Sequence, residues 1–150
     1  MSAILVFGRS GQVATELQRL GDVVALGRDQ VDLTDAAACA AAIHAHRPRA
    51  VINAAAYTAV DRAEEEEVLA TLINGEAPTA MAQACEALDI PLVHISTDYV
   101  FAGSGTHAWA PDDSTEPQNA YGRSKLAGEA GIRAVGGAHA ILRTSWVFSA

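Results

Sequence analysis

Short apolar runs alternate with helical stretches along the whole chain. Apolar runs rich in β-branched side chains predict strands at residues 3–7, 22–26, 50–52, 91–95 and 139–142. Helical stretches are predicted between them at residues 12–20, 35–46, 60–74, 76–88 and 119–134. This alternation predicts an α/β fold with a doubly wound parallel sheet, covered by helices on both faces. Ligands of such sheets bind beyond the carboxyl ends of the strands.

One segment, residues 102–118, follows neither the helical nor the strand period. It contains Gly103, Gly105, Pro111 and Pro117, which favour turns. We expect a single long loop there. Loops of this length inside a compact domain are usually functional.

Charge and composition exclude several classes of protein. The 150 residues are 50% hydrophobic and carry a net charge of −8, which argues against a nucleic-acid or anionic-membrane surface. The first apolar run is too short for a secretory signal, and no run approaches the ~18 residues of a membrane span. We therefore expect a cytoplasmic protein that binds neither nucleic acid nor membrane.

Other reactive or charged residues indicate structural roles. Cys39 and Cys85 lie in helical segments without metal-ligand spacing, which predicts buried thiols. The five histidines are dispersed, so no metal site is expected. The acidic run Glu64–Glu67 is interpreted as a solvated helix face rather than a partner site.

A glycine turn links the first predicted strand to the first helix. Gly8 permits a tight turn, Gly11 lets the backbone approach a pyrophosphate, and Ala14 allows the helix to pack closely on the strand. The helix N-terminus offers free N–H groups to phosphates. In this position the turn favours nucleotide binding over a purely structural role.

The end of the second strand bears on the choice of cofactor. Gly27 and Arg28 stand where an acidic side chain would read the 2′-hydroxyl of NADH. An arginine there can bind a 2′-phosphate, so NADPH is favoured over NADH. Arg28 as a solvated surface charge remains the alternative. Asp32 can contact the adenine or begin the next helix.

Tyr121 and Lys125 stand four residues apart and so share one helix face. A nearby cation lowers the pKa of a phenol and makes it a better proton donor near neutral pH. Ser96 and Thr97 end the fourth strand, where either hydroxyl can contact a substrate carbonyl. The alternatives are a surface helix in which Lys125 pairs with Glu129, and hydroxyls that cap the strand end.

Five segments together resemble the extended short-chain dehydrogenase/reductases, in the family's order and over nearly the whole chain. They are the glycine turn, residues 53–56, 96–101 and 143–147, and the Tyr-x-x-x-Lys pair at 121–125. The resemblance implies a catalytic triad of Thr97, Tyr121 and Lys125. The cofactor contacts that the turn, the end of the second strand and the resemblance together predict are Gly8, Gly11, Gln12, Val13, Arg28, Asp32, Leu33, Ala56, Tyr57, Thr58, Tyr121 and Lys125. The implied substrate contacts are Thr97, Asp98, Tyr99, Tyr121 and Trp146.

The resemblance also implies an activity, namely reduction of the 4-keto group of the dTDP sugar dTDP-4-dehydro-L-rhamnose by NADPH or NADH. Residues 1–150 correspond to the NAD(P)-binding Rossmann domain with its catalytic residues. Most of a smaller C-terminal substrate domain is expected to be missing from this chain. A homodimer, and magnesium near Glu16, follow from the resemblance alone. The alternatives are a non-catalytic subunit, similar to the regulatory subunit of methionine adenosyltransferase, and a nucleotide-sugar epimerase or dehydratase.

Overall fold

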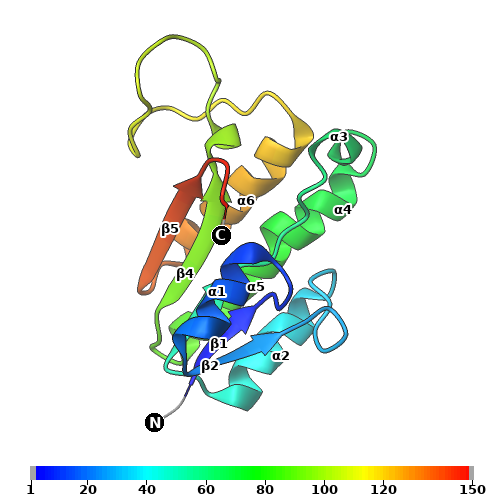
Figure 1. Cartoon of the computed structure of the whole chain (residues 1–150), viewed down its shortest axis with the longest axis vertical. Coiled ribbons are helices and arrows are strands. Elements are labelled where there is room, and N and C mark those ends of the chain that lie inside the picture. Colours follow the sequence, from blue (N-terminus) through cyan, green and yellow to red (C-terminus); the bar gives the residue numbers. More distant parts are fainter. Residues whose placement is uncertain (1–2, 149–150) are drawn as a thin grey trace.

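The computed structural model describes residues 3–148 and contains a five-stranded sheet (Figure 1). The strands are β1 (Ile4–Phe7), β2 (Val23–Leu26), β3 (Ala50–Asn53), β4 (Leu92–Thr97) and β5 (His139–Thr144). Their order is β2-β1-β3-β4-β5, and every neighbouring pair is parallel. The predicted doubly wound parallel sheet is confirmed.

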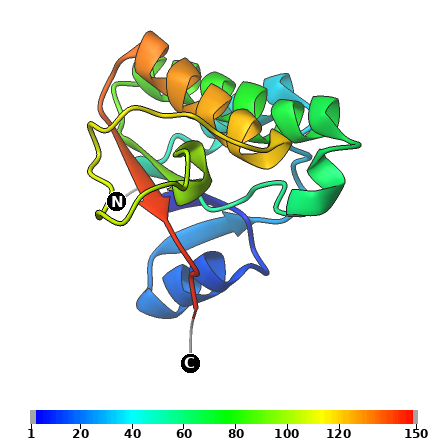
Figure 2. The ribbon, with the colours of Figure 1, turned by 90° about the horizontal axis from the view of Figure 1, so that it is seen from above.

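Helices cover the two faces of the sheet unequally. The main helices are α1 (Gln12–Leu20), α2 (Ala36–His46), α5 (Ala77–Ala87) and α6 (Ala120–Val135). Figure 2 shows α1 on one face and α2, α5 and α6 on the other. Right-handed crossovers produce this division, because the chain reverses its direction across the sheet after β2. No helix in the described part of the chain is both long and apolar enough to cross a membrane.

The main core lies between the sheet and the layer of α2, α5 and α6. Its fully or nearly fully buried members include Leu5, Phe7, Cys39, Ile43, Val51, Met81, Cys85, Leu92 and Ile132. Burial raises the pKa of the Cys39 thiol to about 11 and that of the Cys85 thiol to about 12. Both cysteines are free and buried, as the sequence predicts.

The region between β3 and β4 differs from the two helices predicted for it. Its first part is divided into α3 (Val60–Ala63) and α4 (Glu67–Thr71), with a turn at residues 64–66. A π-helical turn, η1 (Leu72–Glu76), then joins α4 to α5 without a break. Gly75 does not end the helix; a Cβ there would lie 3.3 Å from the Ala127 Cβ, so glycine permits close packing against α6.

Residues 102–118 form the expected long loop, preceded by the short helix η2 (Asp98–Val100). The loop is held against the sheet at two points. The Phe101 and Trp109 rings stack with centroids 4.8 Å apart, and Arg143 Nη1 donates to the Pro111 carbonyl over 3.1 Å. Arg143 therefore places the part of the loop at Pro111 beside β5.

Candidate active site

A cleft of about 650 Å³ opens at the carboxyl ends of β1, β2, β3 and β4. It lies where the strand order reverses around β1, the position at which doubly wound sheets bind ligands. The predicted cofactor residues that line it are Gly8, Gly11, Arg28, Asp32, Leu33, Ala56, Thr58, Tyr121 and Lys125. The structure therefore brings the glycine turn, the end of β2 and the Tyr-Lys pair around one cavity.

The glycine turn packs directly against the loop that follows β3. Gly8 has a φ of 109°, and a Cβ there would lie 3.3 Å from the Ala54 carbonyl carbon. Gly11 is the N-cap of α1 and provides no side-chain cap for the helix. The first N–H groups of α1 therefore face the cleft edge without a side-chain acceptor, an arrangement that suits a phosphate.

Arg9 occupies the space that the missing side chain at Gly27 leaves. A Cβ on Gly27 would lie 2.8 Å from the Arg9 Cζ and 2.5 Å from Asp29 Oδ1. Arg9 donates to Asp29 over 2.7 Å and to Gln30 over 3.2 Å. Arg28 lines the same end of the cleft, with a side chain that is 80% exposed. The sequence analysis missed Arg9, although it lies within the glycine turn itself.

Tyr121 faces the cleft from the first turn of α6. A hydrogen bond with the Thr97 side chain lowers the pKa of its phenol, but burial has the larger effect and raises the pKa overall. Asp98 and Tyr99 raise it further. The Tyr99 ring packs edge-on against the Tyr121 ring, with centroids 5.6 Å apart. The expected lowering of this pKa by Lys125 is therefore wrong for the structure, because spacing alone does not reveal burial.

Lys125 is almost completely buried beneath the cleft, with 2% of its surface exposed. Its Nζ donates to the Ile95 carbonyl over 2.6 Å. Burial lowers the pKa of the ammonium to about 8, although the Glu129 carboxylate partly offsets this effect. The alternative of a surface lysine is excluded by this burial.

Glu129 joins the ends of β4 and β5 to α6. Its carboxylate is fully buried and accepts hydrogen bonds from Ser96 over 2.6 Å and from Arg143 over 2.7 Å. Arg133 forms an ion pair with it at 3.2 Å. These partners lower the pKa of Glu129 in opposition to burial, which raises it. Ser96 thus serves the framework of the site, while its neighbour Thr97 contacts Tyr121.

Asn74 connects the loop after β3 with α6, the helix that carries Tyr121. It lies in the π-helical turn and is 1% exposed. Its Oδ1 accepts from the Tyr57 N–H over 2.8 Å, and its Nδ2 donates to the Tyr57 carbonyl over 3.0 Å and to Ser124 Oγ over 2.9 Å. Ser124 in turn donates to the Tyr121 carbonyl over 2.7 Å. The sequence analysis missed this bridge, which spans residues distant in the chain.

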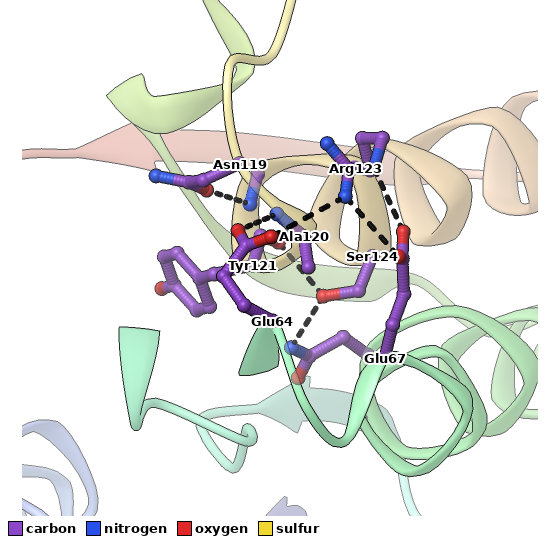
Figure 3. Close-up of polar contacts among 9 residues, drawn as sticks. Glu64, Glu67, Asn119, Ala120, Tyr121, Arg123 and Ser124 are labelled. Atoms are coloured by element: carbon purple, nitrogen blue, oxygen red, sulfur yellow. Dashed lines mark hydrogen bonds and ion pairs between the residues drawn. The ribbon is translucent and has the colours of Figure 1, made fainter. Parts of the chain in front are cut away.

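The acidic run at residues 64–67 is partly solvated, as expected, but it lies mostly in a turn and also contacts α6, which the sequence did not predict (Figure 3). Glu64 Oε1 accepts from the Ala120 N–H over 2.7 Å. Glu67 accepts two hydrogen bonds from Arg123, at 2.7 and 3.1 Å. The run therefore contacts the beginning of α6, the helix that carries Tyr121.

Several predicted contacts do not line the main cleft. Gln12 and Val13 border a smaller hollow of about 210 Å³ beside α1. The Tyr57 hydroxyl donates to Glu66 over 2.5 Å. Trp146 is 91% exposed. The remaining predicted substrate residues, Thr97, Asp98 and Tyr99, lie next to Tyr121 instead.

His94 is a buried polar residue beneath the site. Asn53 Oδ1 accepts from the Ala55 N–H over 3.2 Å, so its Nδ2 faces His94 Nδ1 at 3.1 Å. The His94 Nδ1 is then the acceptor and Nε2 carries the hydrogen, for which the described residues provide no partner. Burial, together with Lys125, lowers the pKa of His94 to about 3.

Potential metal ligands do not gather in the part of the chain that the structure describes. No group of three or more His, Cys, Asp or Glu side chains within residues 3–148 could hold a metal ion. Glu16 accepts from Arg19 over 2.6 Å on the exposed surface of α1. Magnesium near Glu16 therefore remains an expectation from resemblance.

Comparison with known proteins extends this description. The sequence profile of the RmlD substrate binding domain family matches residues 1–150. A dTDP-4-dehydrorhamnose reductase of Streptomyces griseus is 46% identical over 97% of this chain and 50% of its own length. A probable dTDP-4,6-dihydroxy-2-methyloxan-3-one 4-ketoreductase of Streptomyces antibioticus is 43% identical over 96% of this chain and 51% of its own length.

A solved structure of a related protein has the same fold as this chain. The dTDP-4-dehydrorhamnose reductase of Bacillus anthracis in complex with NADP has a TM-score of 0.93 and 33% identity, over 99% of this chain and 55% of that chain. The chain thus spans about half the length of the relatives that it matches.

Proposed function

The chain belongs to the RmlD substrate binding domain family, and from this membership we propose that the full-length protein reduces dTDP-4-dehydro-L-rhamnose to dTDP-L-rhamnose with NADPH. The observation that carries the proposal is the arrangement of Thr97, Tyr121 and buried Lys125 at the edge of a cleft that begins at a glycine turn. Relatives named as dTDP-4-dehydrorhamnose reductases at 42–46% identity support it.

The residues of the cleft suit a nicotinamide dinucleotide. The free N–H groups at the start of α1 can bind a pyrophosphate, and the open space beside Gly11, where a Cβ would meet nothing within 4 Å, leaves room for it. Arg9 and Arg28 provide positive charge for a 2′-phosphate. Gly27 places no side chain at the end of β2, and the carboxylates of Asp29 and Asp32 lie beside the two arginines in the same part of the cleft. A related structure holds NADP, which supports the preference for NADPH.

The catalytic side chains divide the chemistry between them. Bound NADPH supplies the hydride that reduces the keto carbon. Tyr121 donates a proton to the keto oxygen, and its raised pKa keeps the phenol protonated at neutral pH. Thr97 orients Tyr121 and the carbonyl by hydrogen bonding. Lys125, whose pKa is about 8, is mostly protonated near pH 7, and from its place in the lining of the cleft it is proposed to bind the nicotinamide ribose.

The sugar nucleotide is proposed to lie beyond Tyr121, where Asp98 and Tyr99 border the site and the loop at residues 102–118 is fixed. Exposed Trp146 is proposed as a further sugar contact. A cytoplasmic location belongs to the same proposal, since the proposed substrate is a soluble nucleotide sugar. A homodimer is proposed from the family resemblance alone.

The test is a reductase assay on the purified full-length protein with NADPH and dTDP-4-dehydro-L-rhamnose. We expect consumption of NADPH and formation of dTDP-L-rhamnose in equal amounts. Cofactor binding without turnover would instead indicate a regulatory subunit. A rearranged sugar without net cofactor consumption would indicate an epimerase or dehydratase. The 43% identical ketoreductase makes a second dTDP-4-keto sugar a useful competing substrate.

A further inference from the structure

The turn between α3 and α4 contacts the first residues of the catalytic helix. We propose that Glu64 is a positioning residue for Tyr121: it acts as a long-range cap that sets where α6 begins and hence where the phenol lies. The inference rests on the proposed reductase function, in which Tyr121 is the proton donor. It concerns a residue that touches neither substrate nor cofactor.

The first N–H groups of α6 are satisfied from two different parts of the chain. Asn119, the ordinary N-cap, accepts from the Gly122 N–H over 2.7 Å. Glu64, 56 residues away in the sequence, accepts from the Ala120 N–H over 2.7 Å. The residue between these two amides is Tyr121, so its backbone is bracketed by both caps (Figure 3). A carboxylate also complements the positive end of the helix dipole.

The same helical turn also packs closely on η2. A Cβ on Gly122 would lie 2.3 Å from the Tyr99 carbonyl oxygen, so the helix packs directly on the backbone of η2. The Tyr99 ring contacts the Tyr121 ring from this side. Tyr121 is therefore held between η2 on one side and the turn that carries Glu64 on the other.

Ion pairs also join the turn to α6, but they differ from the hydrogen bond between Glu64 and the Ala120 amide. Arg123 donates two hydrogen bonds to Glu67 and approaches Glu64 Oε2 at 3.8 Å. These side chains are about half exposed, so water screens the ion pairs. The Ala120 amide differs, because Ala120 itself is fully buried and its N–H depends on the Glu64 oxygen. Glu64 is thus the member of the run whose loss affects the backbone next to Tyr121.

The test compares three variants of the full-length protein. Glu64→Ala removes the acceptor, Glu64→Gln keeps an acceptor oxygen but removes the charge, and Glu65→Ala is the matched control with the same charge change in the same turn. We expect Glu64→Ala to lower kcat on the order of tenfold, less than the ~100-fold cost of a full 1 Å misplacement. The KM for NADPH should change less than kcat, because Glu64 itself does not line the cleft and the glycine turn on the other side of the cleft is unaffected.

The conservative variant and an exchange measurement separate positioning from general destabilisation. Glu64→Gln should recover most of kcat, and Glu65→Ala should match the wild type. Amide hydrogen exchange should become faster at Ala120 and Tyr121 in Glu64→Ala while the rest of α6 is unchanged. Equal kcat values for Glu64→Ala and Glu65→Ala, with equal exchange rates, would overturn the proposal. A wild-type protein that reduced no keto sugar would refute the proposed function and leave the cap untouched. Unchanged amide exchange at Ala120 and Tyr121 in Glu64→Ala would refute the cap, whatever the activity of the protein.

Discussion

The preference for NADPH over NADH can be tested at the end of the cleft where β1 and β2 terminate. Two arginines lie there, Arg9 within the glycine turn and Arg28 just after β2. Only NADPH carries a 2′-phosphate for them to bind. Replacing either arginine by alanine should therefore weaken the binding of NADPH and leave the binding of NADH almost unchanged.

The structure assigns the larger effect to Arg9. A charge-assisted hydrogen bond contributes roughly 1.5–3 kcal/mol, and less where water screens it. The Arg28 side chain is 80% exposed, so Arg28→Ala should reduce the free energy of NADPH binding by about 1 kcal/mol, which is about fivefold in Kd. The Arg9 side chain is 49% exposed and is already oriented by Asp29, so Arg9→Ala should reduce the free energy of NADPH binding by about 1.5 kcal/mol, which is roughly tenfold in Kd.

Calorimetric titration of each variant with NADPH and with NADH measures these losses. Arg19→Ala, on the exposed surface of α1, is the control for removal of one positive charge. Asp29→Asn should act in the opposite direction and strengthen NADPH binding, because it removes a negative charge beside the 2′-phosphate while its amide oxygen can still accept from Arg9 and orient it. Equal losses of NADH and NADPH affinity in Arg9→Ala and Arg28→Ala would refute the assignment of this end of the cleft to the 2′-phosphate.

Two further predictions concern stability. The pKa of His94 is about 3 in the folded protein and 6.5 in the unfolded chain, so the unfolded chain binds a proton first as the pH falls. The free energy of unfolding should therefore decrease as the pH drops from 6.5 towards 3, by at most ~1.4 kcal/mol per pH unit. Urea unfolding of wild type and His94→Gln should show a flatter pH dependence in the variant; identical slopes would contradict the buried neutral imidazole. Gly128→Ala should destabilise the fold by ~3 kcal/mol or more, because its Cβ would lie 2.1 Å from the Asn74 carbonyl oxygen. A Cβ on Gly131 would lie 1.9 Å from Thr79 Oγ1, which can rotate away only by leaving the Gly75 carbonyl, and 3.0 Å from the Thr79 Cβ. Thermal unfolding should therefore show a clear loss in Gly131→Ala that is smaller than in Gly128→Ala, where the Cβ meets backbone; equal losses would contradict this packing.

The strands and the cofactor cleft could be predicted because their signals are local. The apolar runs that form β1 to β5 need no distant partner to be visible, and the glycine turn lies between a strand and a helix in the sequence itself. The carboxyl ends of parallel strands then meet at one edge of the sheet. The positions of Gly8, Arg28, Tyr121 and Lys125 around one cleft follow from this topology.

The framework around Tyr121 could not be predicted, because its contacts join residues far apart in the chain. Asn74 reaches Ser124 across 50 positions, and Glu64 reaches Ala120 across 56. An acidic run looks the same in sequence whether it is solvated or caps a helix. The direction of the Tyr121 pKa shift was also inaccessible, since it depends on burial, which opposes and exceeds the hydrogen bond from Thr97.

The account depends most on Tyr121 as the proton donor, and Tyr121→Phe in the full-length protein tests this directly. The substitution keeps the ring that packs against Tyr99 and removes only the hydroxyl. We predict that kcat for dTDP-4-dehydro-L-rhamnose falls by ~10²–10⁴, as for loss of a general acid, while NADPH affinity measured by titration is nearly unchanged. A near-normal kcat in Tyr121→Phe would contradict the proposed mechanism.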